Sequence, residues 1–158
     1  INVEVQAEGA QALRVRFVVS GDIDALKLPP PAAPERTDEL WRHTCLEVFA
    51  ADAAGPGYTE FNLAPSTQWA AYRFDGYREG MRGAEVAPPR IQVERTAARL
   101  ELSARLDLPH PASRLSLTAV IEEQGGRMSY WAVRHPAGRP DFHHADGFAV
   151  ELPAPSGP

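Results

Sequence analysis

The sequence is short of several residue types, and each shortage removes a class of protein. It has one cysteine, Cys45, so it can form no internal disulfide and no zinc site built from several cysteines. No apolar run approaches the roughly 18 residues of a membrane-spanning helix. The net charge of −5 argues against a phosphate-backbone partner, which would need a basic surface. We therefore expect no nucleic-acid partner and no membrane span.

Known catalytic motifs are also missing. The chain has no glycine-rich phosphate loop, no HExxH motif and no Ser-His-Asp order. It contains no amphipathic pattern longer than two helical turns. These absences turn attention from catalysis to binding and from helices to strands.

The dominant pattern is the alternation of apolar and polar residues, which is typical of strands with one buried face. It is clearest in 13–19, 100–107 and 115–121. Further strands are predicted at 3–7, 46–50, 58–64, 69–75, 91–94, 128–134 and 148–152, separated by Gly, Pro, Asn and Asp breakers. Many short strands in 158 residues predict an all-β fold, a single-domain antiparallel β-sandwich. We expect the domain to span 1–153 and a frayed tail to span 154–158.

The predicted hairpin of 46–50 and 58–64 has one apolar and one polar face. Alternation places Glu47, Glu60, Asn62 and Tyr58 together on the polar face. If Arg73 on the next strand points the same way, its guanidinium would pair with a carboxylate and keep both acids ionised. Such a face is either a solvated surface with an ion pair or a ligand site. The amide and phenol beside the acids favour the ligand site.

Two patches, 41–49 and 129–144, hold most of the unusual side chains. They mix Trp, Glu, Arg and His in a way that a core does not need. A pocket for a polar ligand with flat apolar faces, such as a sugar, does need them. Exposed tryptophans without a ligand would also be costly.

The same patches carry a family resemblance. The sequence reads WxxTCLEVF at 41–49, YxEFNLxP at 58–65, WAAYxFxxYRxGM at 69–81 and SYWAxxHPxGxPDFHH at 129–144. Together these motifs resemble the bacterial DOMON-like proteins over most of residues 41–148. The wider relatives are the DOMON domains and the family 9 carbohydrate-binding modules, which are β-sandwiches with a ligand site on one sheet.

In the sugar-binding relatives, two tryptophans sandwich a sugar ring, and an acid and an arginine bond its hydroxyls. The resemblance implies that Trp41 and Trp131 are the stacking plates, that Glu47 is the acid and that Arg73 is the arginine. The residues themselves add further ligand-binding positions, namely Glu60, Asn62, His135 and His143. We expect a non-catalytic domain that binds a small carbohydrate or related polyol, with no cofactor and no metal.

Four alternatives remain open at this stage. Met81 or Met128 with a histidine could bind haem, as in other DOMON relatives, although no clear counterpart of that ligand pair is present. Glu47 and Glu60 could act as the acid pair of a hydrolase. The histidines of 135–144 with Asp141 could hold a metal. The aromatic face could instead meet another protein.

The sequence leaves the setting of the protein undecided. It favours the cytoplasm, while a cleaved signal peptide upstream of Ile1 stays open. It fixes neither the oligomeric state nor the identity of the sugar.

Overall fold

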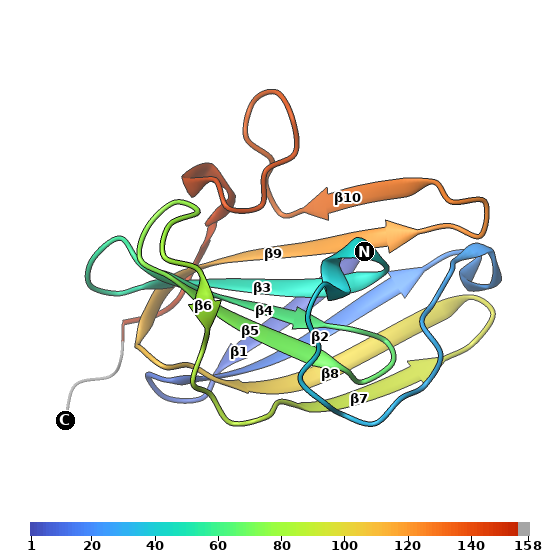
Figure 1. The fold of residues 1–158 in the computed structure, drawn as a ribbon, viewed down its shortest axis with the longest axis horizontal. Coiled ribbons are helices and arrows are strands. Elements are labelled where there is room, and N and C mark those ends of the chain that lie inside the picture. Colours follow the sequence, from blue (N-terminus) through green and yellow to red (C-terminus); the bar gives the residue numbers. More distant parts are fainter. Residues whose placement is uncertain (155–158) are drawn as a thin grey trace.

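The computed structural model describes residues 1–154, which form two antiparallel sheets packed as a β-sandwich (Figure 1). The smaller sheet has the order β1-β2-β8-β7 and comprises β1 (Asn2–Ala7), β2 (Ala12–Ser20), β7 (Arg90–Arg95) and β8 (Arg99–Asp107). The larger sheet has the order β10-β9-β3-β4-β5-β6, and β11 also pairs with β9. Its strands are β3 (Cys45–Asp52), β4 (Tyr58–Leu63), β5 (Trp69–Phe74), β6 (Arg82–Gly83), β9 (Ala112–Glu122), β10 (Met128–Ala132) and β11 (Val150–Glu151). The predicted all-β sandwich is confirmed.

The strands predicted from alternation are all present, with ends that differ by up to three residues. Not predicted were the two-residue strand β6 and three single 3-10 turns, η1 (Ile23–Ala25), η2 (Leu40–Arg42) and η3 (Ala145–Gly147). Such short elements carry too few residues to show a period. No helix among residues 1–154 is long and apolar enough to cross a membrane. The predicted frayed tail spans 154–158, and all of it except residue 154 lies outside the described residues.

The main core fills the space between the two sheets. The predicted pairing of the β3–β4 hairpin is confirmed, because Leu46 lies opposite Leu63 and Val48 lies opposite Phe61. All four side chains are fully buried against Phe17 and its neighbours on the smaller sheet. Burying side chains of this size stabilises the fold by about 1.5–3 kcal/mol each.

The outward face of the larger sheet is also covered, which is unusual for an antiparallel sandwich. Every residue of β4 is buried on both faces. A second apolar cluster forms there, made of Phe49, Tyr58, Ala70, Tyr72, Phe74 and Phe148. The η2 turn contacts β3 and β4, and the segment after β10 projects from the sheet as a loop before η3 (Figure 1). These two covering segments create the space in which the candidate site lies.

Candidate functional site

A cavity of about 430 Å3 opens on the outward face of the larger sheet, and we call it the pocket. This volume lies within the range of small-molecule sites, about 300–1,000 Å3. Its sheet residues are Glu47, Phe49, Glu60, Phe74, Val120 and Tyr130. Its other lining residues are Trp41 of η2, Arg78 and Met81 of the β5–β6 loop, and Pro140, Asp141, Phe142 and His143 of the β10–β11 loop.

A row of buried polar side chains crosses three strands under the pocket. Glu47 on β3 lies opposite Thr118 on β9 and opposite Asn62 on β4, and none of the three is more than 2% exposed. Within residues 1–154, no hydrogen-bond partner is found for Glu47 Oε2 or for either side-chain atom of the Asn62 amide, while the Thr118 hydroxyl lies next to Glu47 and opposes the rise that burial causes in its pKa. Leaving a buried polar group unpaired costs about 1–3 kcal/mol. The fold therefore sacrifices stability at the place where the pocket lies, and such places are candidates for function.

The two pocket carboxyls are close neighbours. Glu60 lies opposite Phe49, two residues along from Glu47, so the acids are diagonal partners on one face. Burial, and then repulsion by Glu60, raises the pKa of Glu47 well above 4.5. Burial raises the pKa of Glu60 to about 7, and Arg78 opposes that shift. The expectation that an arginine keeps both acids ionised is wrong.

Arg73 does not lie on the face of Glu47, and its expected place beside the acids is therefore a wrong prediction. It lies opposite Thr59, on the core side of the sheet, where its Nη1 donates to Asp52 Oδ1 at 2.8 Å. Both side chains of this ion pair are about nine-tenths buried. Alternation correctly separated Arg73 from Tyr72 and Phe74, but it was Tyr72 that joined Glu60. Arg73 stabilises the fold and takes no part in the pocket.

Trp131 also lies on the other face, so the two tryptophans do not form facing plates. Trp131 lies opposite Ala119 on the core side of β10, beside Phe17 and the start of the chain. Its neighbour Tyr130 lies opposite Val120 and lines the pocket. The strand was predicted correctly, but the sequence did not indicate which of its residues faces the pocket. Tyr130 is therefore the aromatic side chain of β10 that shares the pocket with Trp41.

Trp41 and Tyr130 present apolar ring surface at the pocket. Their side chains are 45% and 49% exposed. Trp41 is held by η2, next to the start of β3, as its spacing from Glu47 suggested. The predicted site residue His135 is exposed and does not line the pocket, although its ring packs near Phe142 at 6.4 Å between centroids.

Asp141 joins the two loops that wall the pocket. It accepts hydrogen bonds from Arg78 Nη2 at 2.8 Å, from the His143 backbone N–H at 3.1 Å and from the Tyr77 hydroxyl. These bonds connect the β5–β6 loop to the β10–β11 loop. They also balance the charge of Arg78, whose guanidinium is the cationic group that lines the pocket.

His143 is a neutral side chain at this wall. The Arg78 backbone N–H donates to the Tyr58 hydroxyl at 3.2 Å, and that hydroxyl lies 2.7 Å from His143 Nδ1. Burial, and then Arg78, lowers the pKa of His143 to about 4. Since Tyr58 has no other acceptor among the described residues, its hydroxyl donates to Nδ1 and the ring proton resides on Nε2. His143 thus offers one N–H donor at neutral pH.

The metal alternative finds no support in the part of the chain that is described. There, no three His, Cys, Asp or Glu side chains come together as a metal site. His144 Nδ1 instead accepts from the Asp146 backbone N–H at 3.1 Å and caps η3. Cys45 is fully buried, and burial raises the pKa of its thiol.

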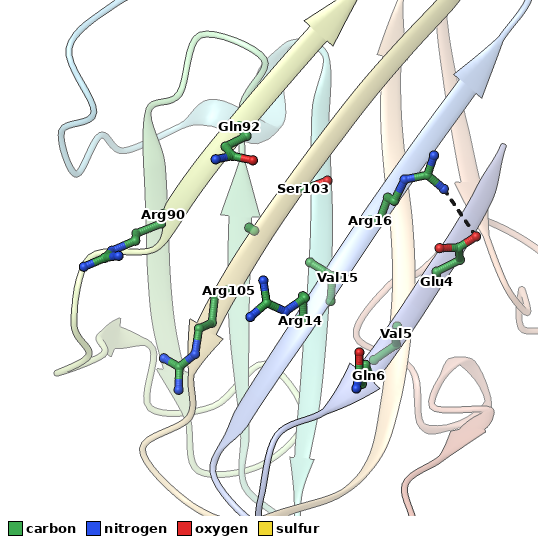
Figure 2. Close-up of a pocket in the computed structure, with 11 residues that line it drawn as sticks. Glu4, Val5, Gln6, Arg14, Val15, Arg16, Arg90, Gln92, Ser103 and Arg105 are labelled. Atoms are coloured by element: carbon green, nitrogen blue, oxygen red, sulfur yellow. Dashed lines mark ion pairs between the residues drawn. The ribbon is translucent and has the colours of Figure 1, made fainter.

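A larger hollow of about 720 Å3 lies on the outward face of the smaller sheet (Figure 2). Figure 2 shows four arginines along it, Arg14, Arg16, Arg90 and Arg105. Three of them are neutralised by acids of the same face: Arg14 and Arg105 by Glu8, and Arg16 by Glu4 and Glu101. This hollow is a solvated surface of ion pairs, so its size does not make it the candidate site.

The sequence analysis did not identify Tyr130, Phe142 or Arg78 as site residues, and it considered Met81 and Asp141 only as possible haem and metal ligands. All but Tyr130 lie in loops, where no periodicity reports direction. In the sequence, the methionine at position 81 and the Pro-Asp-Phe-His-His stretch at 140–144 were the signals that could have pointed to these two loops. The residues that the structure does bring together as predicted are Trp41, Glu47, Glu60 and His143, with Asn62 buried beside Glu47.

Comparisons with known proteins support the fold. No protein-family model matches the chain, and no curated protein matches it. A crystal structure of a "putative carbohydrate-binding protein" from Bacteroides uniformis is similar, with a TM-score of 0.62 and 12% sequence identity. The likeness covers 92% of this chain and 74% of that one. At this identity the likeness shows a shared fold alone, and the DOMON-like resemblance stays a prediction.

Proposed function

We propose that the protein is a non-catalytic domain that binds a small carbohydrate or related polyol in the pocket. The observation that carries this proposal is the buried carboxyl of Glu47, which lines the pocket and whose Oε2 has no hydrogen-bond partner within residues 1–154. A ligand rich in hydroxyls would supply a partner for Glu47. The sugar-related name of the Bacteroides protein of the same fold agrees with this class of ligand.

The apolar walls suit the other character of a sugar. The exposed rings of Trp41 and Tyr130 can stack against the C–H face of a pyranose. In this arrangement Tyr130 takes the place expected for Trp131. Glu47 and Glu60 bond hydroxyls, and His143 Nε2 donates at the wall. We also infer from the motifs of residues 41–144 that the chain is a bacterial DOMON-like protein.

The test is a glycan-array and calorimetric screen of the parent protein, followed by Trp41→Ala and Glu47→Gln. Losing the stacking ring should weaken binding by about 1–3 kcal/mol, and losing the charge-assisted or acid hydrogen bond by about 1–2 kcal/mol. Glu122→Gln is the matched control, because Glu122 is a buried acid of the same face that does not line the pocket.

Thermal melts decide whether Trp41 serves the ligand or the fold. A ring that is 45% exposed should cost little when removed, whereas a core tryptophan costs about 3–5 kcal/mol. A large fall in melting temperature, together with no sugar bound by the parent protein, would refute the proposal.

Hydrolysis is the second candidate, because the expectation that Arg73 keeps Glu47 and Glu60 ionised is wrong. A general acid needs a carboxyl held protonated by its surroundings, and burial raises the pKa of Glu60 to about 7. We retain binding as the proposed function because the pKa values of both acids are raised, whereas a hydrolase needs one protonated and one ionised carboxyl. Turnover of aryl glycosides that disappears in Glu60→Gln would show that the protein is a hydrolase and would refute the non-catalytic proposal.

The haem alternative rests on the position of two potential haem ligands. Met81 and His143 line the same pocket, and His143 Nε2 has no partner in the described residues. We expect the purified protein to be colourless, since Tyr58 fixes His143 and the pocket floor carries two acids. A sharp low-spin spectrum after adding haemin, lost in Met81→Ala, would contradict this expectation.

A further inference from the structure

We propose that the ligand carries a protonated amino group and that Glu47 and Glu60 hold this cation at the pocket floor. An amino sugar is the form that combines it with the proposed function, on which the inference rests. The starting observation is that two buried carboxyls share one small cavity and form no ion pair within residues 1–154, because the lining guanidinium of Arg78 is bound to Asp141. Their side chains are only 2% and 5% exposed.

The charged groups around Glu47 and Glu60 in the described residues do not form ion pairs with them. The acidic, basic and phenolic groups that face the pocket or pack beside it are Glu47, Tyr58, Glu60, Tyr72, Arg78, Tyr130, Asp141 and His143. Arg78 is bound to Asp141, and His143 is neutral. The Tyr72 hydroxyl donates to Asp38 at 2.7 Å, away from the acids. Ionisation of Glu47 and Glu60 would therefore leave up to two negative charges uncompensated.

A third acid on the same face shows what the fold does when it supplies a cation. Glu122 is 8% exposed and lies near His43 Nδ1 at 2.8 Å and Lys27 Nζ at 3.5 Å. The hydrogen bond from His43 lowers the pKa of Glu122, with help from Lys27. Glu47 and Glu60 form no ion pair in the described residues, and burial raises their pKa values although Arg78 opposes the rise for Glu60. The missing cation is therefore specific to the pocket.

The pocket walls suit a cation as well as the floor does. Five aromatic rings line the cavity: Trp41, Phe49, Phe74, Tyr130 and Phe142. Ring faces attract ammonium groups, most strongly where water is excluded. The Arg42 guanidinium already lies over Trp41, 5.3 Å from the ring centroid, so this ring accepts a cation from within the chain. Neutral hydroxyls alone would not use this combination of rings and acids.

Binding of an ammonium group has a consequence that a neutral sugar does not share. A cation next to the two acids favours their ionised form, so one or both release a proton when it binds. The ammonium keeps its own protons, and the carboxyl protons pass to the buffer. The number released is measurable by calorimetry in two buffers of different ionisation enthalpy.

The experiment titrates the 158-residue chain at about pH 6.5, below the ordinary pKa of an amino group. The probes are glucosamine, its neutral counterparts glucose and N-acetylglucosamine, and the sugar-free pair cyclohexylamine and cyclohexanol. We expect glucosamine to bind at least about tenfold more tightly than glucose, with proton release. In Glu60→Gln and Glu47→Gln this preference should shrink to about threefold or less, while Glu122→Gln keeps it. Melting curves check that each variant is folded.

The probes separate the two proposals. Equal affinity for glucosamine and glucose would overturn the cation inference and leave sugar binding intact. Binding of cyclohexylamine over cyclohexanol, with no sugar bound, would support the cation and overturn the sugar. Tight glucosamine binding without proton release, or a preference that survives in both pocket variants, would overturn the role of the acids. No binding by any probe would overturn both.

Discussion

The outward faces of the two sheets treat charge in opposite ways. On the smaller sheet, arginines and acids are exposed and paired with each other around a hollow of about 720 Å3. On the larger sheet, the pocket is smaller, about 430 Å3, and its acids are buried and unpaired. Ion pairs exposed to water change the free energy of unfolding little, whereas a buried polar group without a partner lowers it substantially. The smaller cavity is therefore the better candidate site, because, of the two hollows, it is the one lined by buried acids without ion-pair partners in residues 1–154.

The Arg73–Asp52 pair should give the largest effect, because it is a buried pair that serves the fold. Arg73→Ala leaves Asp52 buried without its partner, which should lower the free energy of unfolding by about 3–5 kcal/mol. Urea unfolding measures this loss. The double change Arg73→Met with Asp52→Leu should recover much of it, and ligand binding should persist in both. A loss of sugar affinity in folded Arg73→Met would show that Arg73 contributes to ligand binding.

Replacing a pocket acid should have a smaller effect of opposite sign. Glu47→Leu removes a carboxyl whose Oε2 has no partner in residues 1–154, so it should raise the free energy of unfolding by about 1–3 kcal/mol. The same variant should lose ligand binding. If Glu47→Leu instead destabilises the protein as Glu122→Leu should, the acid serves the fold and the contrast between the two groups fails.

The pH dependence of stability should also reveal the pocket. The folded-state pKa values of Glu47 and Glu60 lie above their ordinary 4.5, so their contribution is fully present below about pH 4.5. That contribution is lost as the pH rises through the raised folded-state pKa of each acid, which is about 7 for Glu60.

His143 has the opposite sign, since its pKa is lowered from 6.5 to about 4 and its contribution is lost as the pH falls through that range. Of these three groups, only Glu47 and Glu60 contribute to the slope above pH 6.5. Stability should then decline by up to about 1.4 kcal/mol per pH unit for each proton. Urea unfolding between about pH 6.5 and 8 measures this slope, which Glu60→Gln should flatten. A level profile in the parent protein would contradict the raised pKa values.

The outer face of the smaller sheet should give the smallest effect. Arg14→Ala and Glu8→Ala remove exposed pairs that solvent screens. Their melting temperatures should match that of the parent protein within error, in low and in high salt. A clear, salt-sensitive destabilisation would show that this face contributes more than a solvated surface does.

The sequence determined the strands and the faces of the β3–β4 hairpin, because each residue step turns a strand side chain to the opposite face. That period is local, so it placed Glu47, Glu60 and Asn62 together without any knowledge of the fold. It also separated Arg73 from Tyr72 correctly. It could not say which of these two faced the acids, since that depends on how β5 pairs with β4.

Only the tertiary structure decided the rest of the site. Pairing with β9 turned Tyr130 rather than Trp131 to the pocket, and a one-residue change of register would have reversed that choice. Loops 75–81 and 133–147, which have no period, met through Asp141 to build the wall. The same covering of the sheet took Glu47 and Glu60 out of water and raised their pKa values, which no local pattern could report. Residue types were local information, whereas their burial depended on segments distant in the chain.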